Sequence, residues 1–226
     1  MSQLTDATAD ELQILMRNRA STYALLARLY RQEVDGMLLE HLRAMDISSQ
    51  GTAEIIAGLD ELKAYAAGPD SDPTQLAIEY ARIFLGAGGE DSAYPYESVY
   101  TSPERLLMRD ARDDVLLQYQ EEGLDRATQC HEPEDHIALE LEFMAYLCQQ
   151  GALAFENHDD AGGTRYLEKQ EHFLERHLLN WVPMFCQDVI RLGRSKFYEA
   201  AAKMTAEFLD MERQVIGAMV ARSNEA

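Results

Sequence analysis

A histidine and a carboxylate lie one helical turn apart in the stretch of this sequence richest in polar chemistry. Residues 131–147 read HEPEDHIALELEFMAYL, in which five ionisable side chains among six residues precede an apolar helical pattern. His136 and Glu140 have the i, i+4 spacing that lets two side chains pair on a helix. Buried polar groups need partners, since leaving them unsatisfied is costly. Two interpretations stay open: a satisfied polar network at a helix start, and a polar site facing a groove.

The register of this helix is expected to start at Pro133, because a helix tolerates proline at its first position. Glu132 would then be the N-cap, although glutamate is not a preferred capping residue. At about 100° per residue, His136 and Glu140 fall on the inward arc of the helix. The solvent arc holds Asp135, Ala138, Glu142 and Gln149. An Asp135→Ala substitution is therefore expected to change stability by no more than about 0.5 kcal/mol.

A second motif combines aromatic and polar residues outside any helical pattern. Residues 93–101 read AYPYESVYT and follow the glycine-rich run 86–89. Tyrosines in such a segment often cover the edge of a core, but an aromatic loop with a proline can also line a peptide groove. We expect 87–101 to be a loop beside the start of the helix at 133, because both motifs make most sense in one shared site.

Metal chemistry is weakly supported by the pattern. Cys130, His131, Asp135 and His136 are close in sequence but lack the paired spacing of a zinc site. A di-iron bundle needs two Glu-x-x-His elements, and the sequence contains none.

An alternative with a metal remains open. His158-Asp159, with His136 upstream and Asp188 downstream, is similar to the ligands of a helical metal-dependent phosphohydrolase, although the pair falls in a glycine-rich polar stretch. The run GAGGEDS lacks the Gly-Lys-Ser/Thr ending of a phosphate-binding loop.

Helical periodicity dominates the elements that must position these residues. Long helices with short connections predict an all-α, single-domain helical bundle of about eight or more helices over residues 1–226. Loops are expected at 87–101 and 156–163, a hinge near 123–132, and a kink or helix end at Pro183. Helices are expected at about 8–32, 36–46, 52–67, 72–86, 102–123, 133–150, 164–192 and from 195 onward.

The amino-acid composition excludes several kinds of binding partner. With 40 acidic and 20 basic residues, the formal net charge is -20, which argues against nucleic acid and against anionic membrane surfaces. The three cysteines describe no disulfide framework, so reduced thiols and a cytoplasmic location are expected. The acidic start of the chain is unlike a signal peptide, and no apolar run has transmembrane length.

Four stretches together resemble one known family. YARIFLG (80–86), PYESVY (95–100), EPEDHIALEL (132–141) and FLERHLLNWVPMF (173–185) occur in this order. The combination is similar to the TorD/DmsD family of redox-enzyme maturation chaperones. The resemblance covers residues 75–190 and rests mainly on the second and third stretches. Tyr94, where relatives often have a proline, departs from the pattern.

The resemblance implies a cytoplasmic, all-helical chaperone, without catalytic activity or cofactor, for a molybdopterin-containing oxidoreductase. It would bind the twin-arginine leader or the apo form of the catalytic subunit and assist cofactor insertion before export. It would act as a monomer or a domain-swapped dimer, without stable membrane insertion. Carried over to this chain, the client-binding residues are Tyr96, Glu97, Ser98, Tyr100, Glu132, Pro133, Asp135, His136 and Glu140. Carboxylates and aromatics would complement a basic and then apolar leader, and the binding is expected to weaken with salt.

Overall fold

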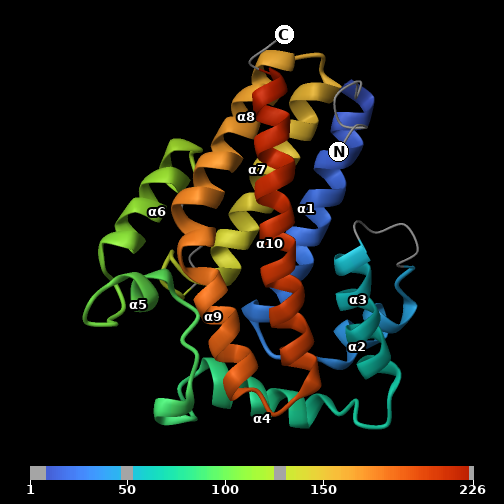
Figure 1. Ribbon diagram of the computed structural model, residues 1–226, viewed down its shortest axis with the longest axis vertical. Helices are drawn as coiled ribbons and strands as arrows, with labels where there is room; N and C mark the ends of the chain where they lie inside the picture. Colours follow the sequence, from blue (N-terminus) through green and yellow to red (C-terminus); the bar gives the residue numbers. More distant parts are fainter. Residues whose placement is uncertain (1–8, 47–52, 125–130, 224–226) are drawn as a thin grey trace.

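Long amphipathic helices lie side by side in the computed structural model, which describes residues 9–46, 53–124 and 131–223. Helices α1 (Ala9–Arg31), α7 (Ile137–Glu156), α8 (Asp160–Phe173) and α10 (Lys196–Ser223) run along the long axis of the molecule (Figure 1). Helix α1 packs against α7, and α7 packs against α8. The described residues contain no β-strand. The prediction of an all-α bundle of eight or more helices is confirmed.

Shorter helices surround these long ones. Helices α2 (Gly36–Ala44) and α3 (Ala53–Ala67) lie on one side of the molecule, and α4 (Pro73–Phe84) crosses one end (Figure 1). On the other side lie α5 (Glu97–Thr101) and α6 (Asp110–Glu121), and α9 (Leu179–Leu192) packs against α5 and α10. A 3₁₀ turn covers Gly89–Asp91.

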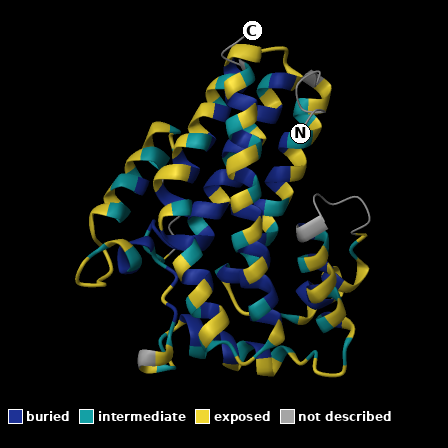
Figure 2. Ribbon diagram, in the orientation of Figure 1, coloured by how far each residue is buried: buried dark blue, intermediate teal, exposed yellow. Residues whose placement is uncertain are grey.

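Burial follows the inward side of each long helix (Figure 2). The core is rich in aromatic rings, which bury large apolar areas. Its largest fully buried side chains include Trp181, Tyr23, Tyr30, Tyr198, Phe173 and Phe185. No helix in the described ranges is long and apolar enough to cross a bilayer.

The boundaries of α4 follow the predicted signals. The carboxylate of Asp72 accepts a hydrogen bond from the backbone N–H of Thr74 at 2.9 Å, and Pro73 is the first helical residue. Gly86 lies just beyond the helix with a φ of 77°, a conformation that glycine adopts without strain. The predicted helix at 72–86 is therefore confirmed.

The second motif and the residues after it differ from the prediction. Residues 97–101, predicted as part of the loop 87–101, form helix α5, and the next helix begins at Asp110, not at 102. Arg105 and Met108 have φ angles of 53° and 60°, in the left-handed region. Because a right-handed helix cannot continue through such residues, 102–109 is an irregular, mostly exposed connection of turns and bends.

The long helical segment predicted at 164–192 is interrupted, but not at Pro183. A π-helical turn, Leu174–Leu178, separates α8 from α9, and Pro183 lies inside α9. A proline inside a helix removes one backbone hydrogen bond and crowds the preceding turn, and π turns are local irregularities of this kind. The prediction that the helix would end or kink at Pro183 was wrong in position, because the irregularity lies one to two turns earlier.

The glycines of the predicted loop 156–163 have packing roles in a helix. Helix α8 begins at Asp160, and Asp159 caps it by accepting a hydrogen bond from the N–H of Gly162 at 2.9 Å. A Cβ atom on Gly163 would lie 2.4 Å from ring atoms of Phe155, so only glycine allows this close approach of α7 and α8. The loop is therefore shorter than predicted. The expected hinge near 123–132 lies mostly outside the described residues, which omit 125–130.

Candidate functional site

The two sequence motifs meet at the start of α7. The N–H of Glu97 donates to the carbonyl of Asp135 at 3.0 Å, and the N–H of Ile137 donates to the carbonyl of Pro95 at 2.9 Å. Tyr96 and His136 consequently form an isolated antiparallel bridge. The prediction that the 87–101 segment lies beside the start of this helix is confirmed.

Asp135 is fully buried, contrary to the prediction that it faces solvent. Its Oδ2 accepts hydrogen bonds from the backbone N–H of Ser98 at 2.8 Å and from the Ser98 hydroxyl at 2.5 Å. The same hydroxyl oxygen accepts from the N–H of Arg109 at 3.2 Å. Burial raises the pKa of Asp135, and the bonds from Ser98 oppose that rise. Through these hydrogen bonds, Asp135 connects the segment before α7 to helix α5 and to the residues that follow α5.

The register of α7 explains this error. The helix begins at Ile137 with His136 as its N-cap, and His136 Nδ1 accepts the N–H of Ala138 at 3.1 Å. The predicted start at Pro133 and the predicted N-cap at Glu132 were wrong, and Ala138 is buried. Residues before the true start do not follow the 100° rotation of a helix, so the helical wheel misplaced them.

His136 is a buried, neutral capping side chain. Burial lowers its pKa to about 4, against the opposing effect of Glu132. Its ring packs edge-on against Tyr96, with ring centroids 5.1 Å apart. Because Nδ1 accepts a hydrogen bond, the ring proton sits on Nε2.

A second cluster joins α5, α6, α7 and α9. Glu97 and Glu140 are 2% and 0% exposed. His177 Nδ1 lies 2.8 Å from Glu97 Oε2, and its Nε2 lies 2.7 Å from the amide nitrogen of Gln118. The indole N–H of Trp181 donates to Glu140 Oε2 at 3.0 Å. His177 and Trp181, spaced i, i+4, thus contact Glu97 from the motif at 93–101 and Glu140 from the motif at 131–147.

Tyr100 borders this cluster and is half-buried. Its ring packs against Trp181 with centroids 5.6 Å apart, and its hydroxyl donates to Asp188 Oδ2 at 3.2 Å. The guanidinium of Arg105 lies 5.3 Å from the centre of the ring. Burial and the charge of Asp188 raise the pKa of Tyr100.

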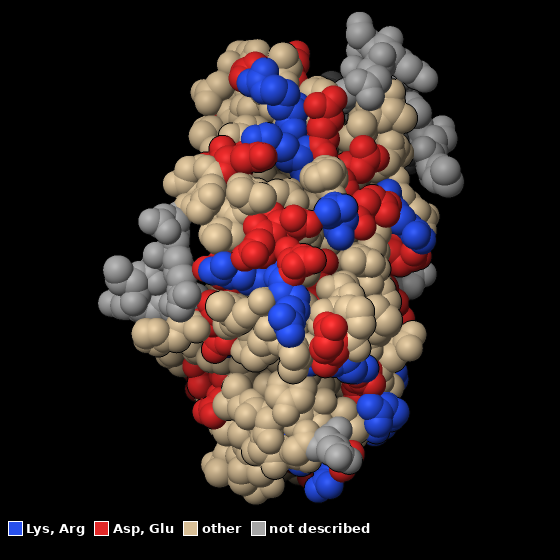
Figure 3. Space-filling view, turned by 90° about the vertical axis from the view of Figure 1, so that its left-hand side faces the viewer, with Lys and Arg blue, Asp and Glu red and all other residues tan. Residues whose placement is uncertain are grey.

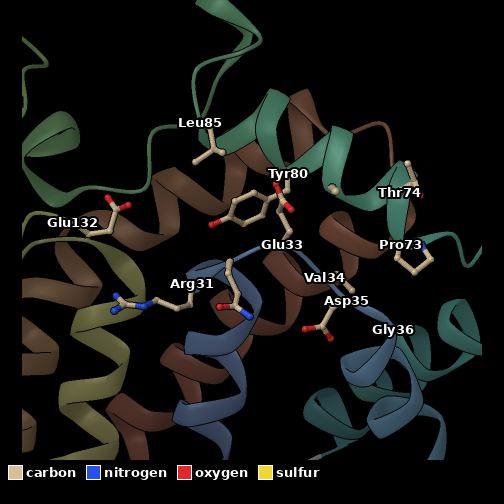
Figure 4. A pocket seen from close by; sticks show the side chains of 12 residues that line it. Arg31, Glu33, Val34, Asp35, Gly36, Pro73, Thr74, Tyr80, Leu85 and Glu132 are labelled. Carbon is tan, nitrogen blue, oxygen red and sulfur yellow. The ribbon is translucent and has the colours of Figure 1, made fainter. Parts of the chain in front are cut away.

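An open groove lies next to the junction of the motifs. Its volume is about 760 Å³, and Tyr96 donates to Glu132, one of its lining residues, at 2.5 Å. Figure 4 shows Glu132 and Arg31 at one end of the groove, Asp35 at the other, and Glu33 and Tyr80 between them. The lining comes from the end of α1, the α1–α2 turn, α4 and the segment before α7: Arg31, Gln32, Glu33, Val34, Asp35, Gly36, Pro73, Thr74, Ala77, Tyr80, Leu85 and Glu132.

The structure divides the nine predicted site residues into two groups. The buried ones are Glu97, Ser98, Asp135, His136 and Glu140. The partly exposed ones are Tyr96, Tyr100, Glu132 and Pro133, of which Glu132 lines the groove.

The sequence reasoning missed the other groove residues. Glu33 and Asp35 lie in a turn between two helices, where acidic residues usually indicate only a solvated surface. Tyr80 belongs to the YARIFLG stretch, which carried part of the resemblance. That stretch was the available signal.

The surface charges are mixed on the face that Figure 3 shows, where acidic and basic side chains lie next to one another. Ion pairs connect α6 with α8 and the π turn, namely Glu122 with Lys169 and Asp114 with Arg176. Within residues 9–46, 53–124 and 131–223, no group of three or more His, Cys, Asp or Glu side chains is placed to hold a metal ion. His136, His158 and Asp188 accordingly belong to no such group.

Comparison with known proteins agrees with the assembled motifs. A sequence model described as "Nitrate reductase delta subunit" matches residues 49–187. "Chaperone protein TorD" of Vibrio cholerae O395 is 26% identical over 220 residues, covering 93% of this chain and 97% of the relative. "Chaperone protein TorD" of Shewanella pealeana is 29% identical, covering 86% of this chain and 90% of the relative. Since the family match spans more than half of the chain, the protein belongs to the TorD/DmsD family, to which the nitrate reductase delta subunit model also corresponds.

Proposed function

We propose that this protein is a cytoplasmic chaperone for the catalytic subunit of a molybdopterin-containing oxidoreductase. In this proposal it binds the twin-arginine leader or the apo form of that subunit and assists cofactor insertion before export. It has no catalytic activity or bound cofactor of its own. The observation that carries the proposal is the end-to-end similarity to proteins named as TorD chaperones, over 93% of this chain and 97% of one relative.

The groove has the chemistry that a basic and then apolar peptide needs. Glu33 is exposed, and its carboxylate forms no hydrogen bond or ion pair within the described parts of the chain. Glu132 is partly exposed and accepts one hydrogen bond from Tyr96. Carboxylates bind guanidinium groups through charge-assisted, often bidentate hydrogen bonds. These two side chains are therefore the proposed contacts for leader arginines.

The apolar part of the leader would follow along α4. Tyr80 forms part of the groove wall but is only 4% exposed, whereas Leu85, the residue after α4, is 60% exposed. Large apolar side chains exposed at the edge of a groove are suited to binding, because contact removes them from water. Together the groove offers charge for the arginines and apolar surface for the residues after them.

The buried motif residues are proposed to act indirectly. Asp135, His136 and Glu97 cannot touch a peptide on the surface, because each is no more than 3% exposed. They instead hold Tyr96 and the segment before α7, which carries Glu132. We therefore separate contact residues from positioning residues within the family motifs.

The test is capture of the client by the full chain from cells of its native source grown under conditions that induce molybdoenzymes. The affinity-tagged parent is compared with a Glu33→Gln/Glu132→Gln variant, and with Glu168→Gln, which changes an exposed residue on α8 outside the groove. The parent and Glu168→Gln should retain an oxidoreductase subunit that lacks its molybdopterin, and the double variant should retain less. Absence of any such subunit, or equal capture by all three proteins, would contradict the proposal.

A further inference from the structure

The buried carboxyl groups of Glu97 and Glu140 both contact side chains on one helical segment, the π turn and the start of α9. His177 contacts Glu97 at 2.8 Å, and Trp181, one turn later, donates to Glu140 at 3.0 Å. Side chains spaced i, i+4 on a helix have Cβ atoms on the order of 5–6 Å apart. The carboxyl groups of Glu97 and Glu140 are therefore neighbours, although they come from α5 and α7.

The side chains that contact this pair are an imidazole and an indole. The amide nitrogen of Gln118 faces His177 Nε2 and donates to it, so the N–H on His177 Nδ1 donates to Glu97. The indole of Trp181 carries no charge. In the described part of the chain, neither carboxyl group forms an ion pair with Lys or Arg.

Glu140 has one oxygen available for a proton. Its Oε1 is buried and has no hydrogen-bond partner among the described residues, whereas its Oε2 accepts the indole N–H. A fully buried carboxylate without a counterion is very costly, and two neighbouring carboxylates cannot both ionise without repulsion. A proton on Oε1 would remove both costs.

We propose that Glu140 is a buried proton-binding site, and that in the folded protein it is a neutral carboxylic acid beside the carboxyl group of Glu97. The titratable groups facing it are Glu97 from α5, Asp135 from the segment before α7, Tyr119 from α6, and His177 from the π turn. This inference does not depend on the proposed function.

The direction of the pKa shift agrees with this geometry. Burial raises the pKa of Glu140 well above its usual range, and the nearby charges of Glu97 and Asp135 raise it further. The indole N–H of Trp181 acts in the opposite direction. Burial also raises the pKa of Tyr119, which is therefore neutral and adds no charge.

The bound proton removes the repulsion between Glu97 of α5 and Glu140 of α7, so both carboxyl groups can pack against the π turn and α9. Its loss would place a second negative charge against Glu97, the residue directly after Tyr96. Tyr96 donates to Glu132 in the groove wall. Glu140 is thus a positioning residue whose protonation keeps this wall in place.

The experiment is infrared spectroscopy of the purified full chain at about pH 8, far above the ordinary glutamate pKa of about 4.3. Exposed carboxyl groups are ionised there, so a carbonyl stretching band of a protonated carboxylic acid reports a buried acid. We compare the parent with Glu140→Gln, which keeps an oxygen to accept the indole N–H. Glu156→Gln is the control, because it changes an exposed glutamate on the same helix.

The parent and Glu156→Gln should show this band, and Glu140→Gln should lose it while keeping the emission maximum of Trp181, the only tryptophan in the chain. A parent spectrum without the band overturns the inference, whatever the variants do. A band that persists in a folded Glu140→Gln protein also overturns it, because the proton would then belong to another residue.

Discussion

Single residues in the two motifs lie closer to the core than their polarity indicates. Asp135 and Ser98 are fully buried, and Asp135 Oδ2 accepts the hydrogen bond of the Ser98 hydroxyl, which in turn accepts the N–H of Arg109. The sequence predicted that Glu97 and His136 share a site, because both motifs needed partners. It placed His136 on the inward arc but did not predict the burial of Asp135, because the helix starts at Ile137 and not at Pro133.

The burial of Asp135 reverses the expectation that replacing this residue by alanine hardly changes stability. Asp135→Ala should lower the free energy of unfolding by about 1–3 kcal/mol, because the N–H and hydroxyl of Ser98 lose a buried acceptor. Urea unfolding measures the change. Asp60→Ala, at an exposed position on α3, is the matched control and should shift stability by less than about 0.5 kcal/mol. Equal effects of the two substitutions would show that the bonds from Ser98 to Asp135 add nothing.

The raised pKa of Glu140 makes a second prediction at the residue scale. Below the unfolded-state pKa of about 4.3 its contribution to stability is complete, because the group is protonated in both states. As pH rises towards the folded-state pKa, only the folded protein holds the proton, so stability falls by about 1.4 kcal/mol per pH unit.

Unfolding free energies measured across this pH range test that linkage. Glu140→Gln should remove this slope, whereas Glu156→Gln should keep the profile of the parent. If the parent and Glu140→Gln profiles run parallel over the whole range, Glu140 takes up no proton on folding.

At the scale of elements, the helices with clear end signals were predictable and the irregular connections were not. Helix α4 has an Asp cap, a first-position proline and a glycine beyond its end, and its bounds agree with the prediction. The connection 102–109 has a Ser-Pro start typical of a helix, but Arg105 and Met108 adopt left-handed φ angles. Such conformations are fixed by tertiary contacts, here with Ser98 and Tyr100, that no local pattern contains.

This connection makes a prediction about backbone strain. Met108 is 58% exposed and has a φ of 60°, a conformation costing a non-glycine residue about 1 kcal/mol. Met108→Gly should therefore raise the free energy of unfolding by up to about 1 kcal/mol, because glycine removes the strain. Thermal or urea unfolding gives the value.

The neighbouring residue provides the control for that change. Leu107 is 43% exposed and is not among the residues with positive φ. Leu107→Gly should lower stability by about 0.5–1 kcal/mol, since glycine only adds freedom to the unfolded chain. A Met108→Gly protein that loses as much stability as Leu107→Gly would show that the left-handed backbone is not strained.

At the scale of the whole molecule, the sequence predicted the all-α fold and the family but not the groove. Periodicity is local and identifies helices, whereas the groove brings together α1, the α1–α2 turn, α4 and Glu132. Glu33 and Glu132 are about a hundred residues apart in the chain, and only the packing of these segments places them together. The net charge of -20 attracts a basic ligand from every side, so local contacts must be separated from this general field.

The salt dependence of binding separates electrostatic attraction from apolar contacts. The affinity for a basic leader peptide should fall as ionic strength rises from about 0.01 M to 0.15 M, because the screening length shortens from about 30 Å to about 8 Å. Fluorescence anisotropy with a labelled peptide measures it. An affinity that stays constant across this range would mean that the apolar contacts with exposed residues such as Leu85 dominate.

The most direct test of the groove assignment is the affinity of a synthetic peptide with two adjacent arginines followed by an apolar run. We predict that Glu33→Gln/Glu132→Gln weakens its binding about 2-fold to 30-fold, since each of the two exposed ion pairs contributes about 0.2–1 kcal/mol. Glu168→Gln, with the same chemical change outside the groove, should bind as the parent does. Replacing both peptide arginines by lysines should also weaken binding to the parent, because lysine cannot form bidentate bonds. Equal binding of the arginine peptide by the double variant and by Glu168→Gln would contradict the assignment of the groove as the leader-binding site.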